Sequence, residues 1–478
     1  MASAYDVVVC GAGIAGVAAA WALAERGARV LLVDERPPLS LTSDKSTECY
    51  RNLWPGPGDA MVRLMNRSID LLEQLADESD NVFGLNRRGY LYATADPAGP
   101  ALLRAAAEKS CVLGAGELRV HGGDQRRKAE VGRELALGQV VVPVVGRRSS
   151  VVGYVPAPAH GYRGQPDGAD LLLDRALIRR HFPYLSERVT AVLHARRCGW
   201  LSAQQLGTYL LERARAVGAC LALARVEEVD VTNGSVAGVR LRGAEDVRAG
   251  CFVNAAGPLL REVGRMLGLE LPVYSERHRK LAFEDRLGVV PRDAPMLIWA
   301  DPVELSWSDE ERALLAEAPE THHLLGRLPA GAHTRPEGHG ASQWLLALWA
   351  YDAEPVDEVF PLPADEQFAE VALRGVAEMI PGLRAYVERP PRPVLDGGYY
   401  TKTRENRPLV GPLEVRGAYI LGALSGYGVM AACGAADLLA AHVTGGPLPS
   451  YAAALSPARY RDPAYQALLE DWGETGQL

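Results

Sequence analysis

Three glycines near the start of the chain, Gly11, Gly13 and Gly16, have the spacing of a loop that cradles phosphates. The first glycine allows a tight turn, the second lets the backbone approach a pyrophosphate, and the third lets a helix pack closely on a strand. Asp34 follows Gly16 by eighteen residues, where a carboxylate accepts hydrogen bonds from a ribose hydroxyl. These four residues together predict a dinucleotide-binding site.

The neighbouring segments supply the elements that such a loop requires. Residues 5–10 form an apolar run that predicts a strand, and an alanine-rich helix is expected from the glycine loop to Arg26. Gly27 ends this helix, and residues 28–33 predict a second strand. Residues 7–24 carry no charge, but the glycines placed between strand and helix favour a nucleotide fold over a membrane segment or a signal peptide.

Composition limits the classes of function. The chain has 478 residues, a net charge of −8 and a pI near 5.8, so it offers no broad attraction for nucleic acid or anionic lipid. Its seven cysteines are an odd number and form no C-x-x-C pair or metal-ligand spacing. These observations predict a cytoplasmic protein with free thiols and no metal site, and with neither a membrane nor a nucleic acid as partner.

After residue 34 the sequence predicts further helices and strands, and its last part again contains a strand, a glycine-rich turn and a helix. Helical patterns occur near residues 59–76 and 125–138, and "RVEEVDVTNGSVAGVRL" predicts a hairpin around its Asn-Gly turn. The segment "YSERHRKLAF" predicts a strand, while the Gly- and His-rich "GAHTRPEGHG" is typical of a surface loop. The uncharged run over residues 418–436 contains glycines and a serine, so it predicts a strand, a turn and a helix.

Four blocks in order carry a resemblance to a known superfamily. They are "GAGIAG…VDER", "GWLSAQQL", "VNAAGP" and "NRPLVGP…GALSGYGV", and they span nearly the whole chain. The chain resembles the D-amino-acid oxidase-like flavoproteins, and within them the branch of sarcosine oxidase, glycine oxidase and dimethylglycine dehydrogenase. The first block is common to many FAD and NAD proteins, whereas the ordered set is specific.

The resemblance implies an α/β fold. A Rossmann-like FAD-binding domain of the glutathione-reductase type would be interleaved with an α+β substrate domain built on a mixed or antiparallel sheet. The expected boundaries are residues 1–78, 165–262 and 395–446 for the FAD-binding domain, 79–164 and 263–394 for the substrate-binding domain, and 447–478 for a C-terminal extension.

The resemblance also implies an extended FAD with its adenine end at the glycine loop. Val226 matches a position whose backbone contacts the adenine, and Gly426 and Gly428 match backbone that approaches the flavin ring and ribityl chain. The expected cofactor-binding residues are Gly11, Gly13, Ile14, Ala15, Gly16, Asp34, Glu35, Arg36, Ser43, Ser46, Thr47, Val226, Ala256, Gly257, Gly422, Gly426, Tyr427, Gly428, Val429 and Met430.

Three departures from the family pattern narrow the expectation. Gly398 stands where sarcosine-oxidase-like enzymes tether flavin through a cysteine, which predicts noncovalent FAD. Met430 stands where a lysine of that branch holds the substrate carboxylate, so a simple N-methyl amino acid is disfavoured. The segment "WLLALWAYD" contains no lysine, although the lysine credited with promoting the oxygen reaction is expected there. Oxygen or another electron acceptor therefore stays open.

Five residues are candidates for contact with substrate or flavin ring. Lys45 and Arg51 lie in the segment that runs beneath the flavin in this family; a cation there stabilises reduced flavin, and a guanidinium clamps a carboxylate. His278 and Lys280 alternate with Glu276 onto one face of a predicted strand, and the matching strand borders the substrate side of the flavin. Tyr427, like Tyr400, is expected near the ring. The alternatives are solvent-facing charges, pyrophosphate contacts and aromatic packing between domains.

The favoured activity is oxidation of a C–N bond in an amine or amino-acid-like substrate to an imine, with hydride transfer to flavin N5. No indispensable catalytic base can be named from the sequence. A long, tryptophan-rich substrate region and Met430 predict a bulky or cyclic amine, with or without a carboxylate. The alternatives are monooxygenation or alcohol oxidation, and a flavin-binding partner protein without turnover. "ILGALSGYG" in place of a Gly-Asp-Ala-x-His segment counts against the hydroxylases.

Overall fold

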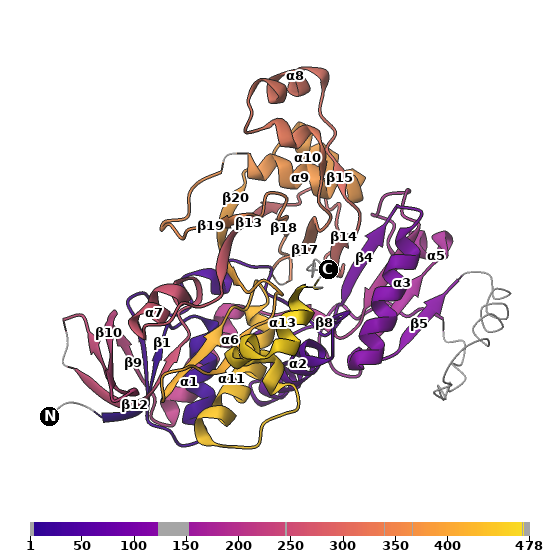
Figure 1. The fold of residues 1–478 in the computed structure, drawn as a ribbon. Helices are drawn as coiled ribbons and strands as arrows, with labels where there is room; N and C mark the ends of the chain where they lie inside the picture. Colours follow the sequence, from indigo (N-terminus) through magenta and orange to yellow (C-terminus); the bar gives the residue numbers. More distant parts are fainter. Residues whose placement is uncertain are drawn as a thin grey trace.

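The structure is a computed structural model that describes residues 4–122, 153–243, 246–338, 340–365, 367–470 and 472 of the chain. The helical pattern expected over residues 125–138 lies outside these residues. Two large sheets organise the described part of the molecule, and the chain crosses between them several times (Figure 1).

An eight-stranded sheet has the N-terminal strand at its centre. In spatial order it runs β10 (Val226–Thr232), β11 (Ser235–Leu241), β12 (Val247–Asn254), β1 (Ala4–Cys10), β2 (Val30–Asp34) and β9 (Cys220–Leu223), while β22 (Ala418–Gly422) pairs with β12, and β21 (Leu409–Pro412) with β22. β1 is parallel to both β2 and β12. The predicted hairpin is confirmed as β10 and β11, joined at Asn233 and Gly234, which both have positive φ.

The second large sheet is mixed and has ten strands. Its spatial order is β19 (Pro355–Val356), β13 (Tyr274–Glu284), β18 (Trp344–Leu348), β17 (His333–Pro336), β14 (Met296–Trp299), β4 (Tyr90–Thr94), β7 (Ala191–Ala195), β6 (Ala169–Leu172) and β5 (Leu118–His121), with β20 (Val394–Lys402) paired to β13. The described residues also contain two short strand pairs, β3 (Cys49–Arg51) with β8 (Cys198–Trp200) and β15 (Val303–Glu304) with β16 (Arg327–Leu328). The predicted α/β fold is confirmed, and it contains the expected mixed sheet.

Helices cover both sheets (Figure 1). They are α1 (Ile14–Ala24), α2 (Ala60–Glu78), α3 (Gly99–Ser110), α5 (Arg175–His181), α6 (Ala203–Ala216), α7 (Leu260–Met266), α8 (Asp309–Glu317), α9 (Phe368–Met379), α10 (Arg384–Glu388), α11 (Gly428–Thr444), α12 (Ala452–Leu455) and α13 (Pro463–Glu470). Short 3₁₀ turns that border the site are η1 (Thr42–Asp44) and η4 (Gly257–Leu259).

The two uncharged runs of the sequence are strand–turn–helix units, as predicted. The first consists of β1 and α1, and the second of β22 and α11. α1 is buried along nearly its whole length because α6 and α11 both pack against it. Small alanine side chains allow these close helix contacts, and burial on all sides explains why the segment lacks a polar face. Within the described residues, no helix is long and apolar enough to cross a membrane.

Strand pairing differs from the expected domain boundaries at three strands. β6 and β7 fall within residues 165–262 and most of β20 within residues 395–446, yet all three belong to the ten-stranded sheet. The sequence did not show this because the pairings that join these strands to the sheet, with β5, β4 and β13, involve segments distant in the chain. We keep the division into two domains as a proposal, with these strands assigned to the substrate side.

The expected surface loop "GAHTRPEGHG" was wrong for its central residues. His333–Pro336 forms β17, which lies between β14 and β18 in the ten-stranded sheet. Arg335 is only 1% exposed, because its guanidinium lies over the ring of Trp200 and bonds the carbonyl oxygens of Thr47 and Pro336. Gly331 and Gly340 at the two ends of the segment have positive φ, which is typical of turns. The sequence prediction extended this turn character to the residues between them, which form the strand.

Candidate functional site

The glycine loop joins β1 to α1, and its backbone cannot accept larger residues. Gly11 has a φ of +104°, and a Cβ there would lie 2.5 Å from the carbonyl oxygen of Ala255. A Cβ on Gly16 would lie 1.7 Å from the carbonyl oxygen of Gly11. These two glycines therefore let α1 begin directly against the ends of β1 and β12. Gly13 precedes the helix in an extended conformation and provides no side-chain cap.

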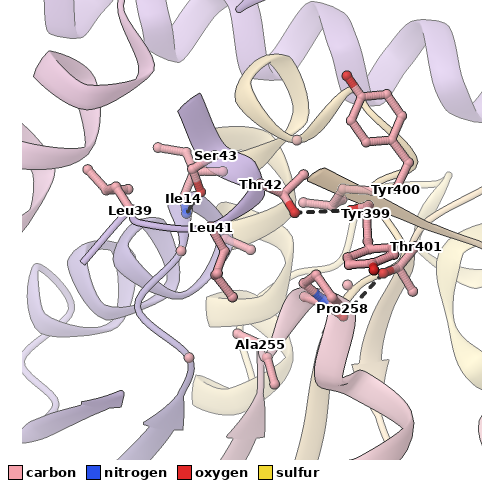
Figure 2. A pocket seen from close by; sticks show the side chains of 18 of the residues that line it. Ile14, Leu39, Leu41, Thr42, Ser43, Ala255, Pro258, Tyr399, Tyr400 and Thr401 are labelled. Carbon is pink, nitrogen blue, oxygen red and sulfur yellow. Dashed lines mark hydrogen bonds between the residues drawn. The ribbon is translucent and has the colours of Figure 1, made fainter. Parts of the chain in front are cut away.

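A long cleft starts at this loop and runs between the 39–46 segment, the end of β12 and the start of α11. Figure 2 shows Ile14 and Ser43 close together on one wall, with Ala255, Pro258 and the residues of β20 around the remaining sides. The expected cofactor-binding residues that line the cleft are Gly11, Gly13, Ile14, Ala15, Asp34, Ser43, Ser46, Ala256, Gly257, Gly422, Gly426, Gly428 and Val429.

Asp34 is fixed at the end of the cleft where the glycine loop lies. One carboxylate oxygen accepts a hydrogen bond from the backbone N–H of Ala12 at 2.7 Å, and the other accepts one from Arg36 at 2.9 Å. The remaining lone pairs of the two oxygens are compatible with a ribose hydroxyl. The Oγ of Ser43 accepts a hydrogen bond from the backbone N–H of Ile14 at 2.9 Å, which connects the 39–46 segment to the first turn of α1.

The other expected cofactor residues lie elsewhere. Thr47, Tyr427 and Met430 line a second cavity. Gly16 lies behind the loop, where its contact is with Gly11 rather than with the cleft. Glu35 and Arg36 follow β2 and pair with each other at 3.3 Å, and Val226 begins β10.

The second cavity has a volume of about 560 Å³ and lies between the ten-stranded sheet and the start of α11. It meets the long cleft at two residues, Tyr400 and Gly426, which line both. Gly426 has a φ of +80°, and a Cβ there would lie 2.3 Å from the ring of Tyr400. A glycine is thus required for the start of α11 to approach this tyrosine where the two cavities join.

Arg51 supplies a fixed cation to the second cavity. It lies on β3 and is 4% exposed, and its Nη1 donates to the hydroxyl of Tyr92 at 2.8 Å. Its guanidinium also lies over the ring of Trp54, 4.7 Å from the ring centroid. Such a held, planar group is suited to a carboxylate, because two of its N–H donors can bind both oxygens.

His278 belongs to a hydrogen-bonded cluster in the same cavity. Its Nε2 lies 3.1 Å from Oε2 of Glu276, and Lys402 Nζ lies 2.6 Å from the same oxygen. Burial would raise the pKa of Glu276, but the hydrogen bonds from His278 and Lys402 outweigh burial and hold that pKa below its ordinary value. Burial lowers the pKa of His278, although the bond to Glu276 opposes the shift. The ring of His278 stacks on Tyr400 with centroids 3.9 Å apart.

The remaining candidates have other surroundings. Lys45 Nζ lies 2.8 Å from a carboxylate oxygen of Asp396, and Lys280 Nζ lies 3.5 Å from the carbonyl oxygen of Ser46. Neither lysine lines the long cleft or the second cavity. Tyr427 lines the second cavity, but its hydroxyl donates to the backbone oxygen of Asn406 at 3.0 Å.

Several lining residues of the second cavity were missed from the sequence. His333 is hidden in β17, and Lys402 lies opposite Tyr274 in the pairing of β20 with β13. Lys402 had one signal, since it is one of only five lysines. Tryptophans gave little guidance: Trp349 and the unpredicted Trp54 line the cavity, whereas Trp299 is packed in the core.

The chain matches the family described as FAD dependent oxidoreductase (DAO) over residues 6–442. This protein belongs to that family. The glycine loop, the cleft that runs from Asp34 to Gly426 and the positions where a Cβ would fill the cradle all fit an FAD. The oxidoreductase thus has a cofactor cleft and an adjoining cavity. No curated protein sequence matches it. Among its described residues, no group of three or more His, Cys, Asp or Glu side chains is placed to hold a metal ion.

Solved structures share the whole fold of this FAD-dependent oxidoreductase at low sequence identity. L-proline dehydrogenase from P. horikoshii is 18% identical, covers 96% of this chain and 99% of its own, and has a TM-score of 0.69. Glycine oxidase from Geobacillus kaustophilus is 17% identical, with coverages of 95% and 98% and a TM-score of 0.66. Iminodiacetate oxidase from Chelativorans sp. BNC1 is 17% identical, with coverages of 94% and 98% and a TM-score of 0.64.

Proposed function

We propose that this oxidoreductase oxidises the C–N bond of an amino-acid-like amine to an imine. The observation that carries the proposal is the junction of the cofactor cleft and the second cavity at Tyr400 and Gly426, with the buried Arg51 in the second cavity. Bound FAD supplies the acceptor for a hydride from the carbon that bears the amine. The proteins with similar structures are L-proline dehydrogenase, glycine oxidase and iminodiacetate oxidase, and their names agree with this class of substrate.

The protein's own residues bind and orient the substrate. Arg51 is placed to bind a carboxylate, because Tyr92 and Trp54 hold its guanidinium in one orientation. Tyr400 forms the wall between cleft and cavity, and Tyr427 contributes its ring, since its hydroxyl is already bonded to backbone. These fixed side chains position the reacting C–H bond and exclude water from it.

A substrate larger than glycine fits the second cavity best. Its volume of about 560 Å³ is within the usual range for small-molecule sites. Met430 lines it, so the cation that binds a carboxylate is Arg51 rather than a residue of the α11 turn. We therefore propose a bulky or cyclic amine that bears a carboxylate.

We propose that the reduced flavin reacts slowly with oxygen and that another molecule is the main electron acceptor. The segment "WLLALWAYD" includes β18, and its cavity-lining residues Leu348, Trp349 and Ala350 are uncharged. A cation is thus lacking on this stretch. Mixing the reduced protein with oxygen and following flavin reoxidation tests the proposal, and rapid reoxidation would contradict it.

The direct test is anaerobic mixing of the purified holoenzyme with N-methyl amino acids, cyclic imino acids and larger amines. Loss of the visible flavin absorption without added NADPH supports the proposal. A requirement for NADPH supports monooxygenation instead, and no bleaching by any compound of the panel supports a partner protein without turnover.

The variant Arg51→Met tests carboxylate binding. It should weaken binding of a carboxylate-bearing substrate by roughly 10- to 100-fold, the usual effect of losing hydrogen bonds to a charged group. The same amine without its carboxylate is the matched control and should bind both proteins alike. Equal losses for both ligands would show that Arg51 supports the cavity but does not bind the carboxylate.

A further inference from the structure

Two histidines line the second cavity, and their hydrogen bonds distinguish them. His333 Nδ1 lies 2.7 Å from the backbone oxygen of Gly331, whereas His278 Nε2 lies 3.1 Å from the carboxylate of Glu276. A carbonyl and a carboxylate can only accept hydrogen bonds, so each of these nitrogens is the donor. The neutral form of His278 therefore carries its lone pair on Nδ1, and the neutral form of His333 carries it on Nε2.

Glu276 has two donors, and this double contact defines the charge state of the cluster. Lys402 Nζ lies 2.6 Å from the oxygen that His278 also approaches, and the Glu276 side chain is 10% exposed. Glu276 and Lys402 thus form a buried ion pair whose charges compensate each other. Burial keeps the pKa of His278 below its ordinary value, while the negative charge of Glu276 raises this pKa and the positive charge of Lys402 lowers it. The resting cluster holds a neutral imidazole beside an ionised carboxylate.

We propose that His278 accepts, at Nδ1, the proton of the incoming substrate ammonium, and that Glu276 and Lys402 are positioning residues for this transfer. The inference rests on the proposed function. The N–H bond of the ammonium breaks, its electron pair stays on the amine nitrogen, and an Nδ1–H bond forms on His278. The neutral amine can then form the C=N bond as hydride leaves its carbon for the flavin. The imidazolium later returns its proton to water.

Glu276 makes His278 a better proton acceptor than His333. An imidazolium at His278 gains a direct bond to a carboxylate, whereas His333 has only a carbonyl oxygen behind it. Burial lowers the pKa of His333 to about 4, and the positive charges of Arg51 and Arg335 contribute to the decrease. The charged or titratable groups near His278 include Glu276 on β13, Tyr400 and Lys402 on β20, His333 on β17 and Asp352 after β18. Lys280 follows His278 by two residues on β13, but its Nζ lies near the carbonyl oxygen of Ser46.

The protonation state is testable without turnover. In holoenzyme labelled with ¹⁵N at histidine, the His278 resonances are assigned by their loss in His278→Gln, and the two nitrogens report the tautomer. Near neutral pH we expect a protonated Nε2 and an unprotonated Nδ1. Lys402→Met should raise the pKa of His278 and Glu276→Gln should lower it, whereas the exposed Lys109→Met is the control and should leave it unchanged. A proton on Nδ1, or no response to Lys402→Met, would overturn the inference.

The kinetic test uses the amine that bleaches the flavin fastest in the anaerobic panel. His278→Gln should reduce the flavin about 100-fold more slowly near pH 7, the lower range for loss of a general base. The difference should shrink to about threefold near pH 10, where amines lose the proton without help. Lys402→Met retains the imidazole and should shift the pH profile of flavin reduction toward higher pH. This second variant keeps the test valid if His278→Gln fails to fold.

The outcomes separate this inference from the proposed function. If no amine bleaches the flavin while the tautomer is as expected, the proposed function fails and the charge arrangement stands. If an amine bleaches the flavin but His278→Gln is equally slow near pH 7 and pH 10, His278 does not take the proton. His333→Gln, from the same cavity, should give a rate change that does not vary with pH.

Discussion

Replacing Asp34 with alanine separates two roles of one carboxylate. The carboxylate accepts backbone hydrogen bonds from Ala12 at 2.7 Å and from Arg36 at 2.9 Å, so the apoprotein already depends on it. Hydrogen bonds to a charged group contribute about 1.5–3 kcal/mol each, and the half-buried position reduces this value. We expect Asp34→Ala to lower the free energy of unfolding of the apoprotein by about 1–3 kcal/mol.

The affinity for FAD should fall in addition, because the variant lacks the expected ribose acceptor. A loss of about 1–3 kcal/mol corresponds to roughly a 5- to 150-fold rise in Kd. Urea unfolding of the apoprotein measures the first effect, and titration of apoprotein with FAD measures the second. Glu270→Ala is the control: Glu270 is exposed, pairs with Arg265 at 3.0 Å and lines neither the cleft nor the second cavity, and such surface pairs contribute little. A destabilised Asp34→Ala apoprotein with unchanged FAD affinity would refute the ribose role.

Three further predictions follow from the same structure. Acid or heat denaturation should release FAD, because Gly398 stands where a tether cysteine is expected; flavin that stays on the denatured chain contradicts this. Gly426→Ala should weaken FAD binding at least about tenfold, since φ is +80° and the new Cβ would meet Tyr400, whereas Gly250→Ala, with open space around it, should not. Lowering the pH from 6.5 through 4 should cost about 3 kcal/mol of folding stability through His333, because the unfolded chain binds the proton first as pH falls. His333→Gln should remove that part of the pH dependence in urea unfolding, and parallel curves for both proteins would contradict the assignment.

Local patterns predicted the elements that need little help from the rest of the chain. The glycine loop and Asp34 predicted the β1–α1–β2 unit because one continuous segment, Ala4–Asp34, meets the requirements: a tight turn, close helix packing and a carboxylate at the end of the second strand. The Asn-Gly hairpin and the two uncharged strand–helix units were also local. Alternation along β13 placed Glu276, His278 and Lys280 on one face, and the structure brings the first two into one cavity.

The sequence by itself determined the family, the FAD fold and the side chains that could do chemistry; the tertiary structure alone decided which of them meet. Lys402 reaches Glu276 because β20 pairs antiparallel with β13, a register between segments 126 residues apart that no local pattern encodes. Lys280 instead lies near Ser46 and Lys45 near Asp396, and neither lysine lines the cleft or the second cavity. Alternation along a strand decides on which face of the sheet a side chain lies. Which residues of other strands lie next to it depends on how the strands pair, and that pairing is set by the burial of apolar residues over the whole sheet.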